Sequence, residues 1–181
     1  MTTEIQNKIK TIRDKKQTCR FYISVDKVEK YVDGFVVDTS KQFVLVREFV
    51  DFDAKGFVII PINKIIKLRQ ARAEKSFTRI LKLEKLVEKA LIFEKMPLEN
   101  YVEIFKSIKK RYKYAIVENA FEGVNDFCIG EIARINKESI SILYFDITGK
   151  VDKTTTKIPF KHITNIDFET NYINTFIRHL K

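Results

Sequence analysis

The residues of this chain best able to do chemistry are basic side chains that gather on two short stretches. Residues 64–89 hold nine Lys and Arg against three Asp and Glu, and residues 106–113 hold five basic residues and no acidic one. Such side chains neutralise phosphates, which gives salt-dependent binding with little sequence preference. Tyr112 and Tyr114 alternate with Arg111 and Lys113 at the end of the second stretch, and their rings can stack on bases. The pattern predicts contact with RNA or another polyanion through Lys67, Arg69, Arg72, Lys75, Arg79, Lys109, Lys110, Arg111, Tyr112 and Lys113. A second interpretation of the same residues is a solvated helix face with core-facing tyrosines.

The remaining reactive residue types do not form a site by spacing. His162 and His179 have no second His or Cys at the spacing of a zinc site, and they are expected at the surface. Cys19 and Cys128 show no CxxC spacing, so we expect two free thiols. The motif Asp51-x-Asp53 lacks the further oxygen ligands of a calcium loop and is interpreted as a solvated turn. No nucleotide-binding or hydrolase motif occurs, and we expect no catalytic residues, metal or cofactor.

Composition indicates a folded protein. The chain has 181 residues, a formal net charge of +10, 45% apolar residues and 15 Phe, with only 5 Gly and 3 Pro. That apolar content can fill two small cores and argues against global disorder. No window approaches 18 consecutive apolar residues, and the first residues lack the apolar run of a signal peptide. We therefore expect a cytoplasmic protein without a membrane partner.

The chain contains an internal repeat, which is decisive for its architecture. Gly34 and Gly130 are 96 residues apart and open two similar stretches. Pro61 and Pro159 are separated by 98 residues, and Phe77 and Phe176 by 99, as a few loop insertions would leave. The repeat predicts a first helix-plus-barrel unit over 1–82, a helical connector over 83–97 and a second unit over 98–181.

Periodicity predicts the same elements in each copy. Apolar residues at spacings of three and four indicate helices over 3–16, about 77–91, 98–111 and 171–180. Alternating apolar residues between turn signals indicate five strands in each copy. The predicted strands are 21–25, 31–37, 43–49, 57–60 and 65–68, then 114–117, 127–135, 139–145, 155–158 and 163–166. Many short strands with tight turns favour small antiparallel barrels, giving a mainly β, α+β chain in which each barrel is preceded and followed by a short helix.

The unit resembles the Sm-like branch of the SH3-type barrels. The matching residues are Gly34, Val44-Leu45-Val46, Gly56, Pro61 and Ile65–Leu68 in copy one, and Gly130, Ile140–Ile142, Gly149, Pro159 and Ile163–Ile166 in copy two. The resemblance implies two tandem five-stranded barrels and a non-catalytic binding function. It does not carry over the family's RNA pocket, because Thr39–Phe43 and Asn136–Ser139 depart from the Asp-x-aromatic-x-Asn motif of its RNA binders.

Two kinds of partner therefore stay open. RNA or single-stranded nucleic acid would contact the basic helices. Alternatively, the chain is a protein-interaction or scaffold module that binds a protein, or itself, through strand edges, with the acidic barrel faces as its working surface.

Overall fold

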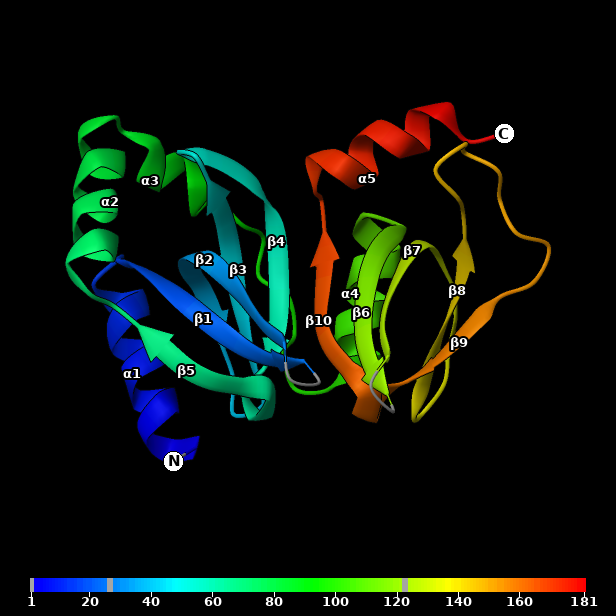
Figure 1. Ribbon diagram of the computed structural model, residues 1–181, viewed down its shortest axis with the longest axis horizontal. Coiled ribbons are helices and arrows are strands. Elements are labelled where there is room, and N and C mark those ends of the chain that lie inside the picture. Colours follow the sequence, from blue (N-terminus) through cyan, green and yellow to red (C-terminus); the bar gives the residue numbers. More distant parts are fainter. Residues whose placement is uncertain (1, 26–27, 122–123) are drawn as a thin grey trace.

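The computed structural model describes residues 2–25, 28–121 and 124–181, and most of them lie in strands (Figure 1). The first half contains α1(Thr2–Asp14), β1(Thr18–Val25), β2(Val28–Thr39), β3(Phe43–Val50), β4(Asp53–Pro61), β5(Ile65–Arg69), α2(Arg72–Leu83) and α3(Leu86–Ala90). The second half contains α4(Tyr101–Arg111), β6(Tyr114–Phe121), β7(Val124–Ile135), β8(Ser139–Tyr144), β9(Thr156–Pro159), β10(Ile163–Phe168) and α5(Asn171–Phe176). Single 3₁₀ turns precede β5 and β10 and follow α5. The predicted α+β class, mainly β with flanking helices, is confirmed.

All ten strands form one antiparallel sheet in the order β5-β1-β2-β3-β4-β10-β6-β7-β8-β9. Numbered within its own half, each set of five follows the same order. The two sets join where β4 pairs with β10, with Val58 opposite Asp167. No ladder among the described residues joins β4 to β5 or β9 to β10, so closure of each half into its own barrel stays a prediction.

The two halves repeat each other in fine backbone detail. The ladder shifts register between Val36 and Asp38 in β2 and between Ile132 and Arg134 in β7, which are equivalent β-bulges. The glycine that precedes each bulge is required by close packing. A Cβ on Gly34 would lie 2.1 Å from the Arg47 carbonyl oxygen, and a Cβ on Gly130 would lie 2.1 Å from that of Leu143. The same close approach of a glycine to the neighbouring strand in both halves is typical of a duplicated unit.

Equivalent positions also fill the interiors of the two halves. Strand residues alternate between faces, and the inward positions of each half are apolar and buried. In the first half these are Cys19, Phe21, Val32, Val36, Val44, Val46, Ile60, Ile65 and Leu68, beneath Ile9 and Ile12 of α1. In the second half they are Ala115, Val117, Cys128, Ile132, Ile140, Ile142, Ile158, Ile163 and Ile166, beneath Phe105 and Ile108 of α4.

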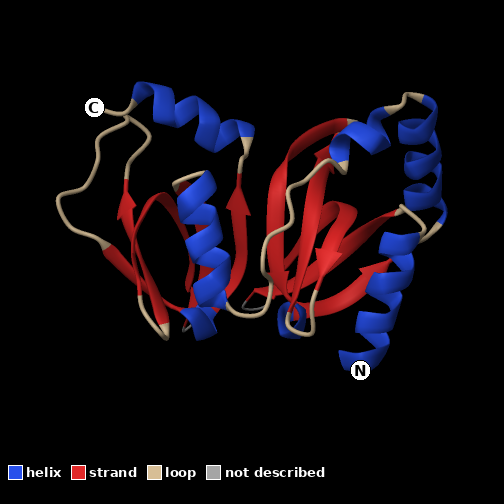
Figure 2. Ribbon diagram, turned by 180° about the vertical axis from the view of Figure 1, so that it is seen from behind, coloured by secondary structure: helices blue, strands red, loops and turns tan. Residues whose placement is uncertain are grey.

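The junction between the halves has its own apolar contacts. Phe43, Leu45, Phe57 and Ile59 project from the opposite face of β3 and β4 and join the cluster that fills the second half. The segment between α3 and α4 runs down this junction, where Met96 and Leu98 are buried (Figure 2). The first half therefore has a core of its own, whereas the core of the second half is continuous with the junction.

The structure corrects several sequence-based boundaries. The helix predicted over 77–91 is two helices, because Lys85 between them has a φ of 56°. The helix predicted from residue 98 begins at Tyr101, where the Asn100 side chain accepts a hydrogen bond from the Glu103 N–H at 3.0 Å. The match of Gly56 with Gly149 was wrong, since Gly56 lies within β4 opposite Glu48 and Gly149 lies in the loop after β8. Within the described residues, every helix is too short or too polar to cross a membrane.

Candidate functional site

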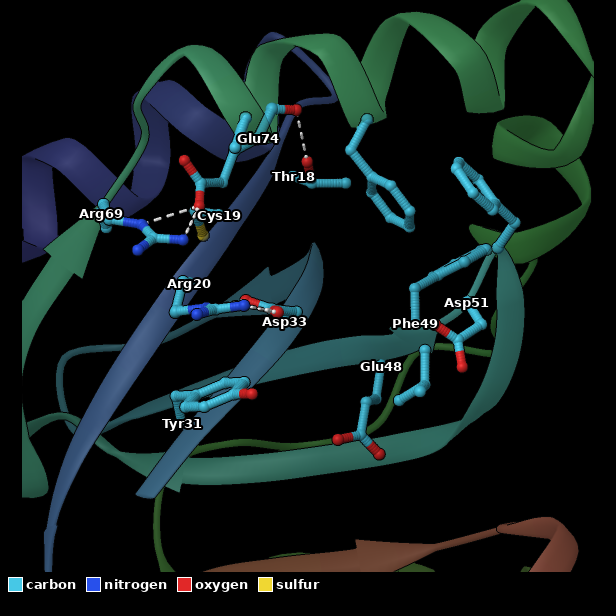
Figure 3. Close-up of a pocket in the computed structure, with 14 residues that line it drawn as sticks. Thr18, Cys19, Arg20, Tyr31, Asp33, Glu48, Phe49, Asp51, Arg69 and Glu74 are labelled. Atoms are coloured by element: carbon cyan, nitrogen blue, oxygen red, sulfur yellow. Dashed lines mark hydrogen bonds and ion pairs between the residues drawn. The ribbon is translucent and has the colours of Figure 1, made fainter. Parts of the chain in front are cut away.

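A polar pocket lies in the first half between strands β1, β2 and β3 and helix α2 (Figure 3). We call it the first-half pocket, and its volume is about 440 Å³. Its walls carry two arginines, Arg20 and Arg69, and four carboxylates, from Asp33, Glu48, Asp51 and Glu74. Pockets of this size suit small ligands or single side chains of a partner.

Arg20 and Asp33 form one wall as a bidentate ion pair. They stand opposite each other on β1 and β2, and Arg20 Nε donates to Asp33 Oδ1 at 2.7 Å while Nη2 donates to Oδ2 at 2.5 Å. The guanidinium carbon lies 3.8 Å from the centroid of the Tyr31 ring. Hydrogen bonding to Asp33 raises the pKa of Arg20, so this guanidinium keeps its charge at any physiological pH.

Arg69 and Glu74 form the wall at the foot of α2. Arg69 Nε and Nη2 donate to Glu74 Oε1 at 2.8 and 2.6 Å, and the Ala71 N–H donates to Oε2 at 2.7 Å. Burial opposes ionisation of Glu74, but the bonds from Ala71 and Arg69 outweigh it and hold the pKa below its usual value. Nearby, Thr18 Oγ1 donates to the Glu74 carbonyl oxygen at 2.9 Å, so α2 docks on β1 through polar contacts.

Glu48 and Asp51 differ from the other two carboxylates, because neither has an ion-pair partner among the described residues. Glu48 is half-buried, and this burial raises its pKa. Phe52 and Phe77, whose ring centroids are 4.7 Å apart, supply an apolar surface beside them. The pocket therefore combines an aromatic wall with two carboxylates that have no ion-pair partner among the described residues.

The same place in the second half is an apolar cluster. At the repeat offset, Arg20, Asp33 and Glu74 correspond to Ile116, Ile129 and Ile173. These three isoleucines are buried with Phe145, and Phe176 of α5 packs against them. Helix α5 thus docks through apolar contacts at the place where the N-terminal end of α2 uses hydrogen bonds, while Phe77 and Leu81 further along α2 pack on Phe35 and Phe49.

The sequence-predicted basic residues of β5 and α2 belong to the first half. Arg69 is committed to Glu74, and the Lys67 ammonium lies 5.3 Å from the centroid of the Tyr22 ring. On α2 the predicted residues Arg72, Lys75 and Arg79 are exposed, and none of them has an ion pair in the described part of the chain.

The predicted residues around the end of α4 are mostly engaged within the protein. Lys109 Nζ donates to the Ala133 carbonyl at 2.7 Å. Arg111 donates to the carbonyls of residues 94 and 95 at 2.7 and 2.8 Å, and Lys113 lies 3.0 Å from a Glu131 oxygen. The Tyr112 ring packs 5.0 Å from that of Phe168, and Lys110 is exposed. The α2 and α4 groups lie on different halves, with the first-half sheet between them (Figures 1 and 2).

Other reactive residues lie away from the pocket or within the core. Cys19 and Cys128 are free and buried, as predicted, and burial raises the pKa of the Cys128 thiol to about 12. His179 is exposed, as predicted, whereas His162 is half-buried against the Phe121 ring. Asp51 is exposed but lines the pocket, so the solvated-turn interpretation was incomplete.

Sequence reasoning missed Arg20, Asp33, Glu48 and Glu74 as a group. They come from three strands and a helix, and each alone resembles an ordinary solvated residue. A residue-by-residue comparison of the two copies contains the missing signal, because it sets three charged residues against three isoleucines. Searches of protein-family models, of curated proteins and of solved structures found no match to this chain.

Proposed function

We propose that this protein is a non-catalytic binding module whose first-half pocket captures a cationic side chain, Lys or Arg, of a partner protein. The observation that carries the proposal is that Glu48 and Asp51 lack ion-pair partners among the described residues in a pocket of about 440 Å³. The equivalent place in the other half is a packed apolar cluster, so folding alone does not require charge there.

The chemistry of a cationic side chain suits the walls of the pocket. An ammonium or guanidinium beside Glu48 would compensate a carboxylate that burial has made costly to ionise. The aliphatic stem of the same side chain would lie on Phe52 and Phe77, since long basic side chains bury their stems on apolar surface. Arg20 and Arg69 are paired with Asp33 and Glu74 and would not repel the ligand strongly.

The outer strand edges are less suited to a partner than the pocket. At β5, Lys8 Nζ donates to the Leu68 carbonyl at 3.3 Å and covers part of that edge. At the other end, β9 has only four residues and carries the exposed Lys157, which are features that discourage edge pairing. We therefore place the interaction on the acidic face rather than on strand edges or self-association.

An amide-shift titration tests the proposal on the full-length protein. Capped arginine and capped lysine are titrated to about 10 mM, a range that detects weak single-residue binding. Capped citrulline, which keeps the shape of arginine without its charge, is the matched control ligand. We expect shifts around residues 48–52 with arginine or lysine and none with citrulline.

Two substitutions locate the binding. Glu48→Gln and Asp51→Asn should each weaken the shifts, whereas Glu138→Gln, which removes an exposed carboxylate in the second half, should leave them unchanged. Equal responses to arginine and citrulline, or no response to any cation, would reject the proposal.

We also propose that each half is an Sm-like barrel unit, with boundaries 1–82 and 98–181 joined by the connector 83–97. The repeated strand order, bulges and buried positions support this. Limited proteolysis would test the boundaries, and cleavage confined to 83–97 is the expected result.

Nucleic-acid contact is a second candidate, because α2 presents Arg72, Lys75 and Arg79 to solvent. Filter binding of single-stranded RNA at about 50 mM salt tests it, and a slope of affinity against salt is expected if these side chains contact phosphates. Triple substitution of the three residues by Ala should flatten that slope. Absence of binding, or binding without a slope, rejects this candidate.

A further inference from the structure

Glu48 lines two cavities rather than one. Beside the first-half pocket lies a second cavity of about 450 Å³, which we call the junction pocket because both halves contribute to it. Glu48 and Lys55 come from the first half, and Ile116, Phe127, Asp167 and Tyr172 come from the second. The two pockets thus meet at a carboxylate that has no ion-pair partner among the described residues.

The junction pocket contains a second carboxylate of the same kind. Asp167 is half-buried on β10, accepts a hydrogen bond from Asn165 Nδ2 at 2.8 Å and has no ion pair in the described part of the chain. The cations nearby are engaged elsewhere, since Lys30 pairs with Glu118 and Lys55 Nζ lies 2.9 Å from Asp53 Oδ2. Desolvation, and then the charge of Glu118, raises the pKa of Asp167 to about 7.

An aromatic pair faces the same cavity. Phe127 and Tyr172 stand edge to face with ring centroids 6.2 Å apart, and they are 45% and 49% exposed. Exposed aromatic faces beside a carboxylate are a favourable environment for an ammonium or guanidinium. The junction pocket therefore repeats the combination of carboxylate and aromatic wall found in the first-half pocket.

We propose that the bound partner segment carries two cationic side chains, one beside Glu48 and Asp51 in the first-half pocket and one between Asp167 and the Phe127–Tyr172 pair in the junction pocket. This inference rests on the proposed function and adds the chemical identity of the ligand, a dibasic peptide segment. A segment held at two points gains effective concentration at the second point, so two cations bind more tightly than one.

Binding of a cation in the junction pocket should change the protonation of Asp167. A cation beside Asp167 stabilises the ionised carboxylate, so the pKa of Asp167 falls when the segment binds. The groups facing Asp167 are Glu48, Glu118, Lys30 and Asn165, and the pKa of Asp167 among them lies at about 7. Binding near pH 7 therefore releases up to about half a proton per bound segment from Asp167.

Calorimetric titration of the full-length protein with synthetic peptides tests the inference. The peptides carry two arginines with one to four glycines between them, and in matched controls either arginine is replaced by citrulline. At the best spacing, the two-arginine peptide should bind about tenfold more tightly than either control, the gain that one additional charged contact provides. Asp167→Asn should abolish both the tenfold gain in affinity and the proton release. Asp51→Asn should instead lower the affinity of every peptide that binds the wild type.

The outcomes separate this inference from the proposed function. If a one-arginine peptide binds and the second arginine adds nothing at any spacing, the two-cation inference fails and the proposed function stands. Retention of the full gain by Asp167→Asn also overturns the inference. If no peptide binds, both fail.

Discussion

The two halves share a backbone but place opposite chemistry at one part of the layer between their strands and the helix that follows. In the first half this part holds Arg20, Asp33 and Glu74 around a pocket, beside an apolar cluster under α2, and in the second half it holds three isoleucines in a closed cluster. The bulges and glycines that shape the strands are the same in both. Replacing partly buried ion pairs with apolar residues is commonly neutral or stabilising, so the retained charge points to use rather than to stability.

A second difference between the halves lies on the outward face of strands three and four of each half. Phe43, Leu45, Phe57 and Ile59 are apolar and form the junction, while their equivalents are Ser139, Ser141, Thr155 and Lys157. The first half therefore carries an apolar face that the other half covers, and the second half carries polar residues at the same place. The second unit thus lacks the face through which the first unit packs on its neighbour.

The largest expected effect follows from exchanging this face. Phe57→Thr installs the residue type of the equivalent position 155 and should lower the free energy of unfolding by about 3 to 5 kcal/mol, the range for removing a buried aromatic ring. The ring is 2% exposed and contacts Phe93 and Phe168, with centroids 4.5 and 5.5 Å away. Denaturant unfolding measures the loss. Thr155→Ala at the exposed equivalent should change stability by under about 0.5 kcal/mol, and a similar loss from both would contradict the asymmetry.

A smaller but still large effect is expected from placing charge in the apolar layer. Ile129→Asp puts the residue type of position 33 among Ile116, Phe145 and Ile173, an apolar cluster that offers it no charged partner. An unpaired buried carboxylate should cost about 2 to 4 kcal/mol in denaturant unfolding. Adding Ile116→Arg should recover part of the loss, because it restores the pair. A single variant as stable as the wild type would show that this layer is not closed.

Much of the fold was accessible from the sequence, because periodicity and turns are local signals. All five strands of each copy were placed, and the bulge glycines Gly34 and Gly130 were recognised as equivalent. The break between α2 and α3 at Lys85 was not predicted, since a lysine gives no signal that its φ is positive. The pocket was missed because its charged residues meet only when β1, β2, β3 and α2 come together. The junction was missed because the apolar outward faces of β3 and β4 cannot be distinguished from a buried strand by pattern alone.

Asp167 gives an intermediate effect that depends on pH. Its pKa of about 7 lies above that of an unfolded Asp, so between about pH 4 and 7 the folded state holds a proton that the unfolded state has lost. Stability contributed by this group falls as pH rises, by at most about 1.4 kcal/mol per pH unit. Asp167→Asn should therefore stabilise the protein relative to the wild type more at pH 8 than at pH 5, as measured by denaturant unfolding at both pH values. Asp146, whose pKa is lowered by its bond from Thr148, is the control, and Asp146→Asn should shift the pH dependence in the opposite sense.

The smallest change in stability, and the sharpest test of the comparison, is the conversion of the pocket to its apolar counterpart. Arg20→Ile combined with Asp33→Ile reproduces residues 116 and 129 in the first half. Because both charges leave together, the free energy of unfolding should stay within about 1 kcal/mol of the wild type, while Arg20→Ile alone should cost more by leaving Asp33 without its partner. The same double variant should lose binding of arginine peptides, since isoleucines would fill the space that the ligand needs. A stable double variant that still binds would show that the charged walls serve neither the fold nor the ligand, and the retained charge of the first half would then have no link to binding.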